Sequence, residues 1–203
     1  MPDFSNGYEH IAQHFLAGRG RAANAIGAAE VLAWARSLPP GAIVLDLGSG
    51  SGLPLTKVLI DEGLTVYGVD ASPTLVAAFR TNLPGVAVAC ESVEESSFFD
   101  RPFDAVLAWG LWFLLPQATQ LDLLRRVADV LRPGGRLLFT APAQACTWRD
   151  VMTGEESRSL GAEVYRARLT DLGFPTVREY DDEGENHYYD AVKRFGASSE
   201  ASR

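Results

Sequence analysis

The strongest constraint on the fold is the stretch VLDLGSGSG, residues 44–52. It continues a short apolar run with no polar alternation, which is typical of a central parallel strand covered on both faces. Glycines follow directly at positions 48, 50 and 52, and Pro54 then stands where a helix would begin. Glycine permits a tight turn and close approach of a ligand to the backbone, and a helix N-terminus offers unpaired N–H groups. The pattern therefore predicts a strand, a ligand-binding turn and a helix.

The same alternation of strand and helix continues along the chain. Further strands are expected at residues 65–69, 86–90, 103–109 and 136–140, with helices from Pro54, from Ser72, from Gln117 and over 155–172. This order predicts an α/β, doubly wound, Rossmann-like parallel sheet. The last two strands, 176–180 and 187–194, are too close for a crossover and must form an antiparallel hairpin. Two helices, 5–17 and 24–37, precede the first strand.

We expect one domain over residues 1–203. Residues 1–38 would form the N-terminal helices and a lid, residues 42–195 the core, and residues 196–203 a small, polar, disordered tail. No apolar run reaches the ~18 residues of a membrane span, and the N-terminus has no secretory signal. Cys90 and Cys146 have no metal or redox spacing, and we interpret them as reduced thiols of a cytoplasmic protein.

Charge favours a small-molecule partner. The formal net charge is −8 and no cluster of Lys or Arg is longer than two residues, which argues against nucleic acid.

The spacing of the glycines separates two classes of ligand. A dinucleotide fingerprint needs its third glycine at position 53, which is Leu53. Asp46 is badly placed beside a pyrophosphate but well placed for a cation.

Asp70 ends the second strand, where a carboxylate can accept hydrogen bonds from both hydroxyls of a ribose. A nucleoside with positive charge and no phosphate fits these features, and S-adenosylmethionine is such a molecule. An NAD-type Rossmann oxidoreductase is the alternative enzyme, and a non-catalytic S-adenosylmethionine-binding protein is a third possibility.

Four motifs in this order, VLDLGSGSG, VYGVDAS, FDAVLAWG and LRPGGRLLFTAP, resemble those of the class I S-adenosylmethionine-dependent methyltransferases over about residues 42–142. The resemblance implies a seven-stranded sheet of order 3-2-1-4-5-7-6 with strand 7 antiparallel, in agreement with the expected hairpin. The stretch AWGLWFLLP lacks the Asn/Asp-Pro-Pro-aromatic run of the amino-methyltransferases of DNA and RNA. The resemblance therefore implies a bacterial, small-molecule type that methylates an O, N or S atom, as a monomer or homodimer.

The resemblance also implies roles for particular residues. The cofactor would be bound by Asp46, Gly48, Ser49, Gly50, Gly52, Asp70, Ala71, Ser72 and Trp109. The acid that binds adenine has two possible registers, Glu91 with Ser92, or the Ser92–Val93 backbone with Glu94. The lid and substrate residues would be Tyr8, Phe15, Arg19, Trp112 and Trp148.

Catalysis need not depend on one residue, because in-line methyl transfer needs mainly positioning and desolvation. GENHYY, residues 184–189, should lie at the ligand edge of the sheet, where His187 is the candidate base and Tyr188, on the opposite face, the fallback. The alternative is an ordinary surface turn. His10 and His14 have metal-like helical spacing without a third ligand nearby, so no metal is expected.

Overall fold

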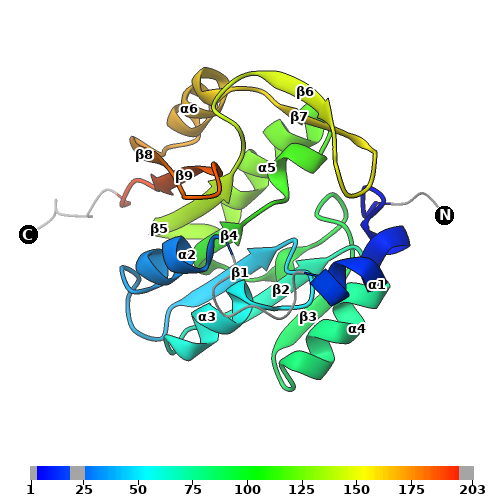
Figure 1. Cartoon of the computed structure of the whole chain (residues 1–203). Coiled ribbons are helices and arrows are strands. Elements are labelled where there is room, and N and C mark those ends of the chain that lie inside the picture. Colours follow the sequence, from blue (N-terminus) through cyan, green and yellow to red (C-terminus); the bar gives the residue numbers. More distant parts are fainter. Residues whose placement is uncertain (1–3, 19–25, 197–203) are drawn as a thin grey trace, which may run out of the picture.

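The structure, a computed structural model, describes residues 4–18 and 26–196 and contains a central seven-stranded sheet with helices on both sides (Figure 1). The helices are α1 (Tyr8–Gly18), α2 (Ala28–Ala35), α3 (Leu55–Asp61), α4 (Pro73–Asn82), α5 (Gln117–Val130) and α6 (Ala162–Asp171), with short 3₁₀ helices η1 (Phe98–Asp100) and η2 (Trp112–Leu114). The strands are β1 (Ile43–Leu47), β2 (Thr65–Asp70), β3 (Ala87–Cys90), β4 (Phe103–Ala108), β5 (Leu131–Thr140), β6 (Cys146–Arg149), β7 (Glu156–Ser159), β8 (Thr176–Asp181) and β9 (His187–Val192).

The predicted topology is confirmed. The large sheet has the order β3-β2-β1-β4-β5-β9-β8, and β9 pairs antiparallel with both of its neighbours. This is the order 3-2-1-4-5-7-6 when the strands of that sheet alone are numbered. Ser72 caps α4 as expected, because its hydroxyl accepts a hydrogen bond from Leu75 N at 3.2 Å.

Alternate residues of the central strands supply two hydrophobic cores, one on each face of the sheet. Leu45 of β1 belongs to the core that contains α5 and α6 residues, whereas Val44 belongs to the core that contains α2 and α3 residues. Val31 and Trp34 of α2 are buried in that second core. Of the two N-terminal helices, α2 is thus part of the folded core, and α1 is the one that reaches the ligand edge.

Two expected boundaries were wrong. The helix expected over 155–172 begins only at Ala162, because residues before it form β7, which pairs with β6 in a separate hairpin. Gly161 lies between β7 and α6 and has a φ of 86°, which favours glycine. A Cβ at this position would also lie 3.0 Å from Ala145 N. The fifth strand begins at Leu131 rather than Arg136, because the backbone after α5 pairs at once with β4, with a register shift near Phe103.

The glycines of the chain allow a matched stability test. A Cβ at Gly52 would lie 2.5 Å from Leu83 and 2.9 Å from Phe79, whereas a Cβ at Gly63 would meet nothing within 4 Å. Both glycines have φ near 80°. We expect Gly63→Ala to cost about 1–2 kcal/mol from backbone strain alone, and Gly52→Ala about 1–3 kcal/mol more from overpacking. Urea unfolding measures both, and equal costs would show that the contact with α4 is unimportant.

Candidate functional site

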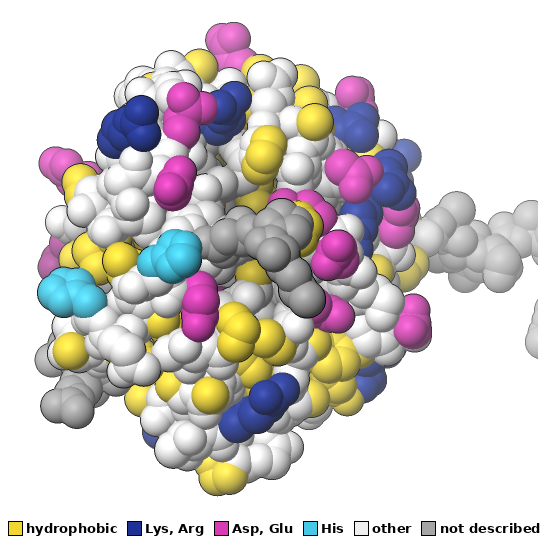
Figure 2. All heavy atoms as spheres, turned by 90° about the vertical axis from the view of Figure 1, so that its right-hand side faces the viewer, with side chains coloured by type: hydrophobic (Ala, Val, Ile, Leu, Met, Phe, Trp, Pro, Cys, Tyr) yellow, Lys and Arg dark blue, Asp and Glu magenta, His cyan; other side chains and the backbone are white. Residues whose placement is uncertain are grey.

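A cavity of about 490 Å³ opens at the carboxyl ends of β1, β2 and β4. Segments far apart in sequence line it: the N-terminal residues and α1, the turn after β1, the end of β2, the loops after β3 and β4, the β6–β7 turn and Asn186. Figure 2 views the molecule from the side on which α1 and the β6–β7 turn lie. In this view apolar and acidic side chains gather around the centre, and most Lys and Arg side chains lie toward the edges. The ligand edge expected from the topology therefore holds a real cavity.

The glycine-rich turn after β1 is held by β2. Gly48 N and Ser49 N both donate to Val69 O, at 2.8 and 3.1 Å. Gly50 has φ 56°, and a Cβ there would meet only Phe15, at 4.0 Å, so its backbone faces open space. Ser49 lines the cavity with a buried hydroxyl that has no hydrogen-bond partner. Gly52, by contrast, does not line the cavity and instead allows close packing against α4.

Asp70 lines the cavity beside Ala71, at the end of β2. One of its oxygens accepts a hydrogen bond from Gly50 N at 2.8 Å and the other from Ser72 N at 2.9 Å. Burial raises the pKa of the Asp70 carboxyl, and these two bonds oppose that shift. Each oxygen keeps further lone pairs for a ligand.

Asp46 of β1 is 4% exposed and lines the cavity as well. Its carboxylate accepts a hydrogen bond from the Thr56 hydroxyl at 2.6 Å. Burial raises the pKa of Asp46 to about 7, and the charge of Asp70 adds to the increase. The group is therefore poised to ionise fully when a cation binds next to it.

The loop after β3 contains the two alternative sets of residues that could bind the adenine. Val93 and Glu94 line the cavity, and Oε2 of Glu94 is buried without a hydrogen-bond partner. Glu91 and Ser92 do not line it; the backbone N–H of Glu91 donates to Asp70 O at 3.0 Å. The geometry favours the register that uses Val93 and Glu94.

Helix α1 covers one side of the cavity. Tyr8 and Phe15, both lining residues, contact each other edge to face at 5.7 Å. The Glu9 carboxylate accepts hydrogen bonds from the Ser72 hydroxyl and from the backbone and hydroxyl of Thr74, so it ties α1 to the N-terminus of α4. Ser72 therefore positions the lid helix and does not itself line the cavity. Arg19 lies outside the described residues.

Trp109 lines the cavity after β4 and depends on Tyr188 for its position. The indole Nε1 donates to the Tyr188 hydroxyl at 2.8 Å, and that hydroxyl donates to Asp182 Oδ2 at 2.9 Å. Burial raises the pKa of Tyr188 far above that of a free phenol. Tyr188 is fully buried and not a lining residue, so the structure gives it a positioning role and not the predicted role of a base.

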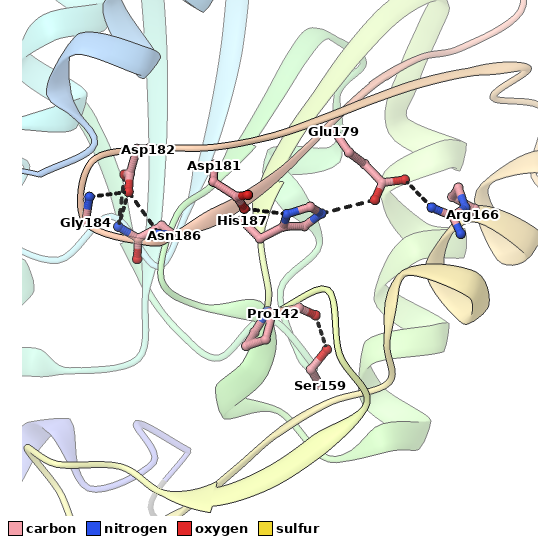
Figure 3. A network of polar contacts seen from close by, with 9 residues as sticks. All are labelled: Pro142, Ser159, Arg166, Glu179, Asp181, Asp182, Gly184, Asn186 and His187. Carbon is pink, nitrogen blue, oxygen red and sulfur yellow. Dashed lines mark hydrogen bonds and ion pairs between the residues drawn. The ribbon is translucent and has the colours of Figure 1, made fainter.

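His187 is also placed differently from the prediction. Its Nδ1 lies 2.6 Å from Asp181 Oδ1 and its Nε2 lies 3.1 Å from Glu179 Oε2, and Glu179 also pairs with Arg166 (Figure 3). Both ring nitrogens are thus occupied by carboxylates of β8, and His187 does not line the cavity. Only Asn186 of GENHYY reaches it. The hairpin does reach the ligand edge, as expected, but the cross-strand contacts with Asp181 and Glu179 hold the ring of His187 outside the cavity lining.

The two remaining tryptophans lie behind the cavity wall. Trp112 is fully buried and packs on Phe139 at 4.6 Å, so it is a core residue and not a substrate contact as predicted. Trp148 of β6 contacts the ring of Phe113 at 5.5 Å, and Phe113 lines the cavity. Sequence reasoning missed the lining residues of the β6–β7 turn, Asp150, Val151 and Met152, because it expected no hairpin there.

A search of the described residues finds no group of His, Cys, Asp or Glu that could hold a metal ion. The same residues contain no helix long and apolar enough to span a membrane.

Comparison with known proteins identifies the core. Residues 44–135 match the family described as "Methyltransferase domain". This segment, from β1 into β5, is similar in sequence to methyltransferase domains. The matched segment contains Asp46, the turn after β1, Asp70 and Trp109, which lie in three of the four motifs, and also the loop after β3, which lies in none of them.

The chain matches only part of the length of its sequence relatives. An uncharacterised methyltransferase of Mycobacterium tuberculosis is 39% identical over 111 residues, which is 50% of this chain but 44% of that protein. The chain thus matches less than half the length of this relative. Two solved structures share the fold over most of the chain. The magnesium protoporphyrin IX methyltransferase of Synechocystis has a TM-score of 0.70 at 18% identity, covering 94% of each chain. The 1,6-didemethyltoxoflavin N1-methyltransferase of Burkholderia thailandensis has a TM-score of 0.68 at 19% identity, covering 92% of this chain and 84% of that one.

The role of Tyr188 can be tested against Tyr180, on which it stacks at 5.0 Å. Tyr188→Phe removes a hydrogen bond from Trp109 and a donor from Asp182, which should cost about 1–2 kcal/mol of unfolding free energy. The hydroxyl of Tyr180 has no hydrogen bond to the described residues, so Tyr180→Phe should cost less than ~0.5 kcal/mol. Chemical denaturation compares the variants, and equal losses would contradict the positioning role.

Proposed function

We propose that the protein is a methyltransferase that moves a methyl group from S-adenosylmethionine to an O, N or S atom of a small molecule. The observation that carries the proposal is the pair of cavity-lining carboxylates, buried Asp46 and half-buried Asp70, on either side of a glycine-rich turn. The matched methyltransferase domain and the solved relative with bound S-adenosylmethionine support it. The Burkholderia enzyme, whose structure contains S-adenosylhomocysteine and a small-molecule substrate, supports the substrate class.

The unpaired polar atoms of the cavity fit this cofactor. Asp70 would hold the ribose hydroxyls, Glu94 Oε2 would accept from the adenine amine, and Asp46 would pair with the amino group near the turn. Gly48, Ser49 and Gly50 would approach the amino-acid part of the cofactor with their backbone. Ala71 and Val93 would flank the adenine. When bound, the cofactor supplies the reactive methyl group.

The residues of the chain would supply position and exclusion of water. Trp109, held by Tyr188, and the rings of Tyr8 and Phe15 would close the cavity around the reacting groups. In-line displacement requires near-attack geometry in a dry site, and neither requirement needs a catalytic base. The occupied ring of His187 agrees with a reaction that proceeds mainly by positioning.

The structure argues against the two alternatives in different ways. A pyrophosphate in the turn would lie near Asp46 and Asp70, and the two cavity-lining carboxylates would repel it. A non-catalytic S-adenosylmethionine-binding protein needs no second compartment. Here the lining continues beyond the cofactor residues to Phe113, Met152 and Asn186, which leaves a wall for a substrate.

The localisation, domain organisation and partners of the protein are also proposals. We propose a cytoplasmic, single-domain enzyme that uses no metal and does not act on nucleic acid or membranes. The net charge of −8 supports the part of this proposal that concerns nucleic acid. Either a monomer or a homodimer is compatible with the site.

Ligand specificity tests the proposed function. S-adenosylhomocysteine at a hundredfold excess over its dissociation constant should raise the melting temperature by about 5–10 °C, whereas NAD should not. Asp70→Ala should weaken binding of S-adenosylhomocysteine by at least roughly a hundredfold, because two hydrogen bonds to a charged acceptor are lost. Glu91→Ala, a nearby acid outside the cavity, is the matched control. A shift with NAD alone, or equal effects of the two variants, would refute the assignment.

Binding should also release a proton at mildly acidic pH. The Asp46 carboxyl of the free protein, with a pKa of about 7, is largely protonated below that pH, and pairing with the ligand's ammonium group requires its ionised form. Affinity for S-adenosylhomocysteine should therefore rise with pH up to about 7, by at most roughly tenfold per pH unit, and then level off. Calorimetry at pH 6 in two buffers of different ionisation enthalpy measures the release. Asp46→Asn should abolish it, and proton uptake by the wild-type protein would contradict the model of a cation at Asp46.

A further inference from the structure

We propose that the substrate is an apolar molecule that carries an amine or another cationic group, and that Asp150 binds this group. The inference rests on the proposed function, since it concerns the part of the same cavity that the cofactor residues leave open. The juxtaposition that carries it is a buried carboxylate from the β6–β7 turn in an aromatic wall.

Asp150 is 8% exposed and lines the cavity directly after β6. Its Oδ1 accepts hydrogen bonds from Met152 N at 2.8 Å and from Thr153 N at 2.9 Å, which shape the turn. Its Oδ2 receives no hydrogen bond from any residue that the structure describes. Because Asp150 lines the cavity and this oxygen has no donor, it is the acceptor that remains available to a ligand.

The β6–β7 turn contacts two other segments that border the cavity. A Cβ at Gly7, just before α1, would meet Thr153 at 3.1 Å, so the turn contacts the lid segment. Trp148 of the same hairpin packs on Phe113, which lines the cavity after β4. Asp150 is thereby held by contacts with the lid segment and with the loop after β4, and none of the four motifs includes it.

The charges of the lining favour a cation. The described lining residues include four carboxylates, those of Asp46, Asp70, Glu94 and Asp150, but no Lys, Arg or His. S-adenosylmethionine has a net positive charge, and its ammonium group is assigned to Asp46. The carboxylate of Asp150 remains without a counter-ion among the described residues. The cavity should therefore attract a cationic group and reject a carboxylate or a phosphate.

The rest of the wall suits an apolar body. Trp109, Leu111 and Phe113 line the interior, and aromatic faces also attract cations. At the mouth, three large apolar lining residues are exposed: Phe4 by 44%, Ile26 by 54% and Val151 by 96%. Such a rim is typical of a binding site for an apolar ligand.

Matched variants separate binding from turn formation. Asp150→Asn removes the charge but keeps an oxygen that can accept from Met152 N and Thr153 N. Thr153→Ala weakens the turn, because the Thr153 hydroxyl accepts a hydrogen bond from Glu155 N and donates one to Asp150. It keeps the Asp150 charge, and Thr153 does not line the cavity. Urea unfolding of both variants measures their effect on the turn.

The probes are 2-naphthylmethylamine, 2-naphthylmethanol and 2-naphthoate, which share a ring system and differ in charge. Their dissociation constants are measured by ligand-observed NMR on the full chain saturated with S-adenosylhomocysteine. The amine should bind at least about fivefold more tightly than the alcohol, and the carboxylate most weakly. Asp150→Asn should remove the preference for the amine while leaving affinity for S-adenosylhomocysteine within about twofold; Thr153→Ala should keep the preference.

The outcomes are distinct. Equal binding of the three probes, or tightest binding of the carboxylate, would overturn the inference while leaving the proposed function intact. Persistence of the amine preference in Asp150→Asn would show that Asp150 only shapes the turn, and would overturn its assigned role. Failure of the wild-type protein to bind S-adenosylhomocysteine at all would instead refute the proposed function on which the inference rests.

Discussion

The site depends on the hydrogen bonds that join the turn after β1 to the end of β2. Gly48 N and Ser49 N donate to Val69 O, and Gly50 N donates to the Asp70 carboxylate. These bonds fix the backbone of the turn relative to the second strand without using any side chain of the turn. The turn therefore stays open on its cavity side, where Gly50 leaves room for a ligand. The carboxylates of Asp46 and Asp70 then line the cavity on either side of this turn, forming a cradle with it.

The other walls are attached to this cradle through a few polar contacts. Glu9 ties α1 to the N-terminus of α4, two residues beyond Asp70, so the lid helix and the second strand share one anchor. Trp109 is held from the far edge of the sheet by Tyr188. The β6–β7 hairpin meets the lid segment near Gly7. A ligand would thus contact four separately anchored segments, and its binding would stabilise all of them against one another.

The sequence allowed the cradle to be predicted because its signals are local. Asp46 lies one residue before the end of β1 and Asp70 ends β2, and the alternation of strands and helices with short connections leaves few possible topologies. The short separation of the last two strands correctly predicted that β9 is antiparallel. The β6–β7 hairpin was missed because residues 155–172 include many good helix formers, and only Gly161 signals the break. Asp150 went unrecognised for the same reason.

The two candidate catalytic residues, His187 and Tyr188, lie outside the cavity lining for a different reason. The topology correctly brought GENHYY to the ligand edge, but the fate of a side chain there depends on its cross-strand neighbour. Asp181 stands opposite His187 in the antiparallel register and takes one ring nitrogen, while Glu179 takes the other. Such pairing depends on register, which the sequence alone did not provide. Trp112 likewise reads as a cavity residue in sequence, yet the 3₁₀ helix η2 turns it into the core.

The most direct test of the account is a crystal structure of the protein in complex with S-adenosylhomocysteine. The account predicts the ligand in the cavity, with both ribose hydroxyls donating to Asp70, the adenine amine donating to Glu94 and the α-amino group near Asp46. The thioether sulfur should face the compartment bordered by Trp109 and Asp150. A ligand bound elsewhere, or one whose ribose makes no contact with Asp70, would contradict the account.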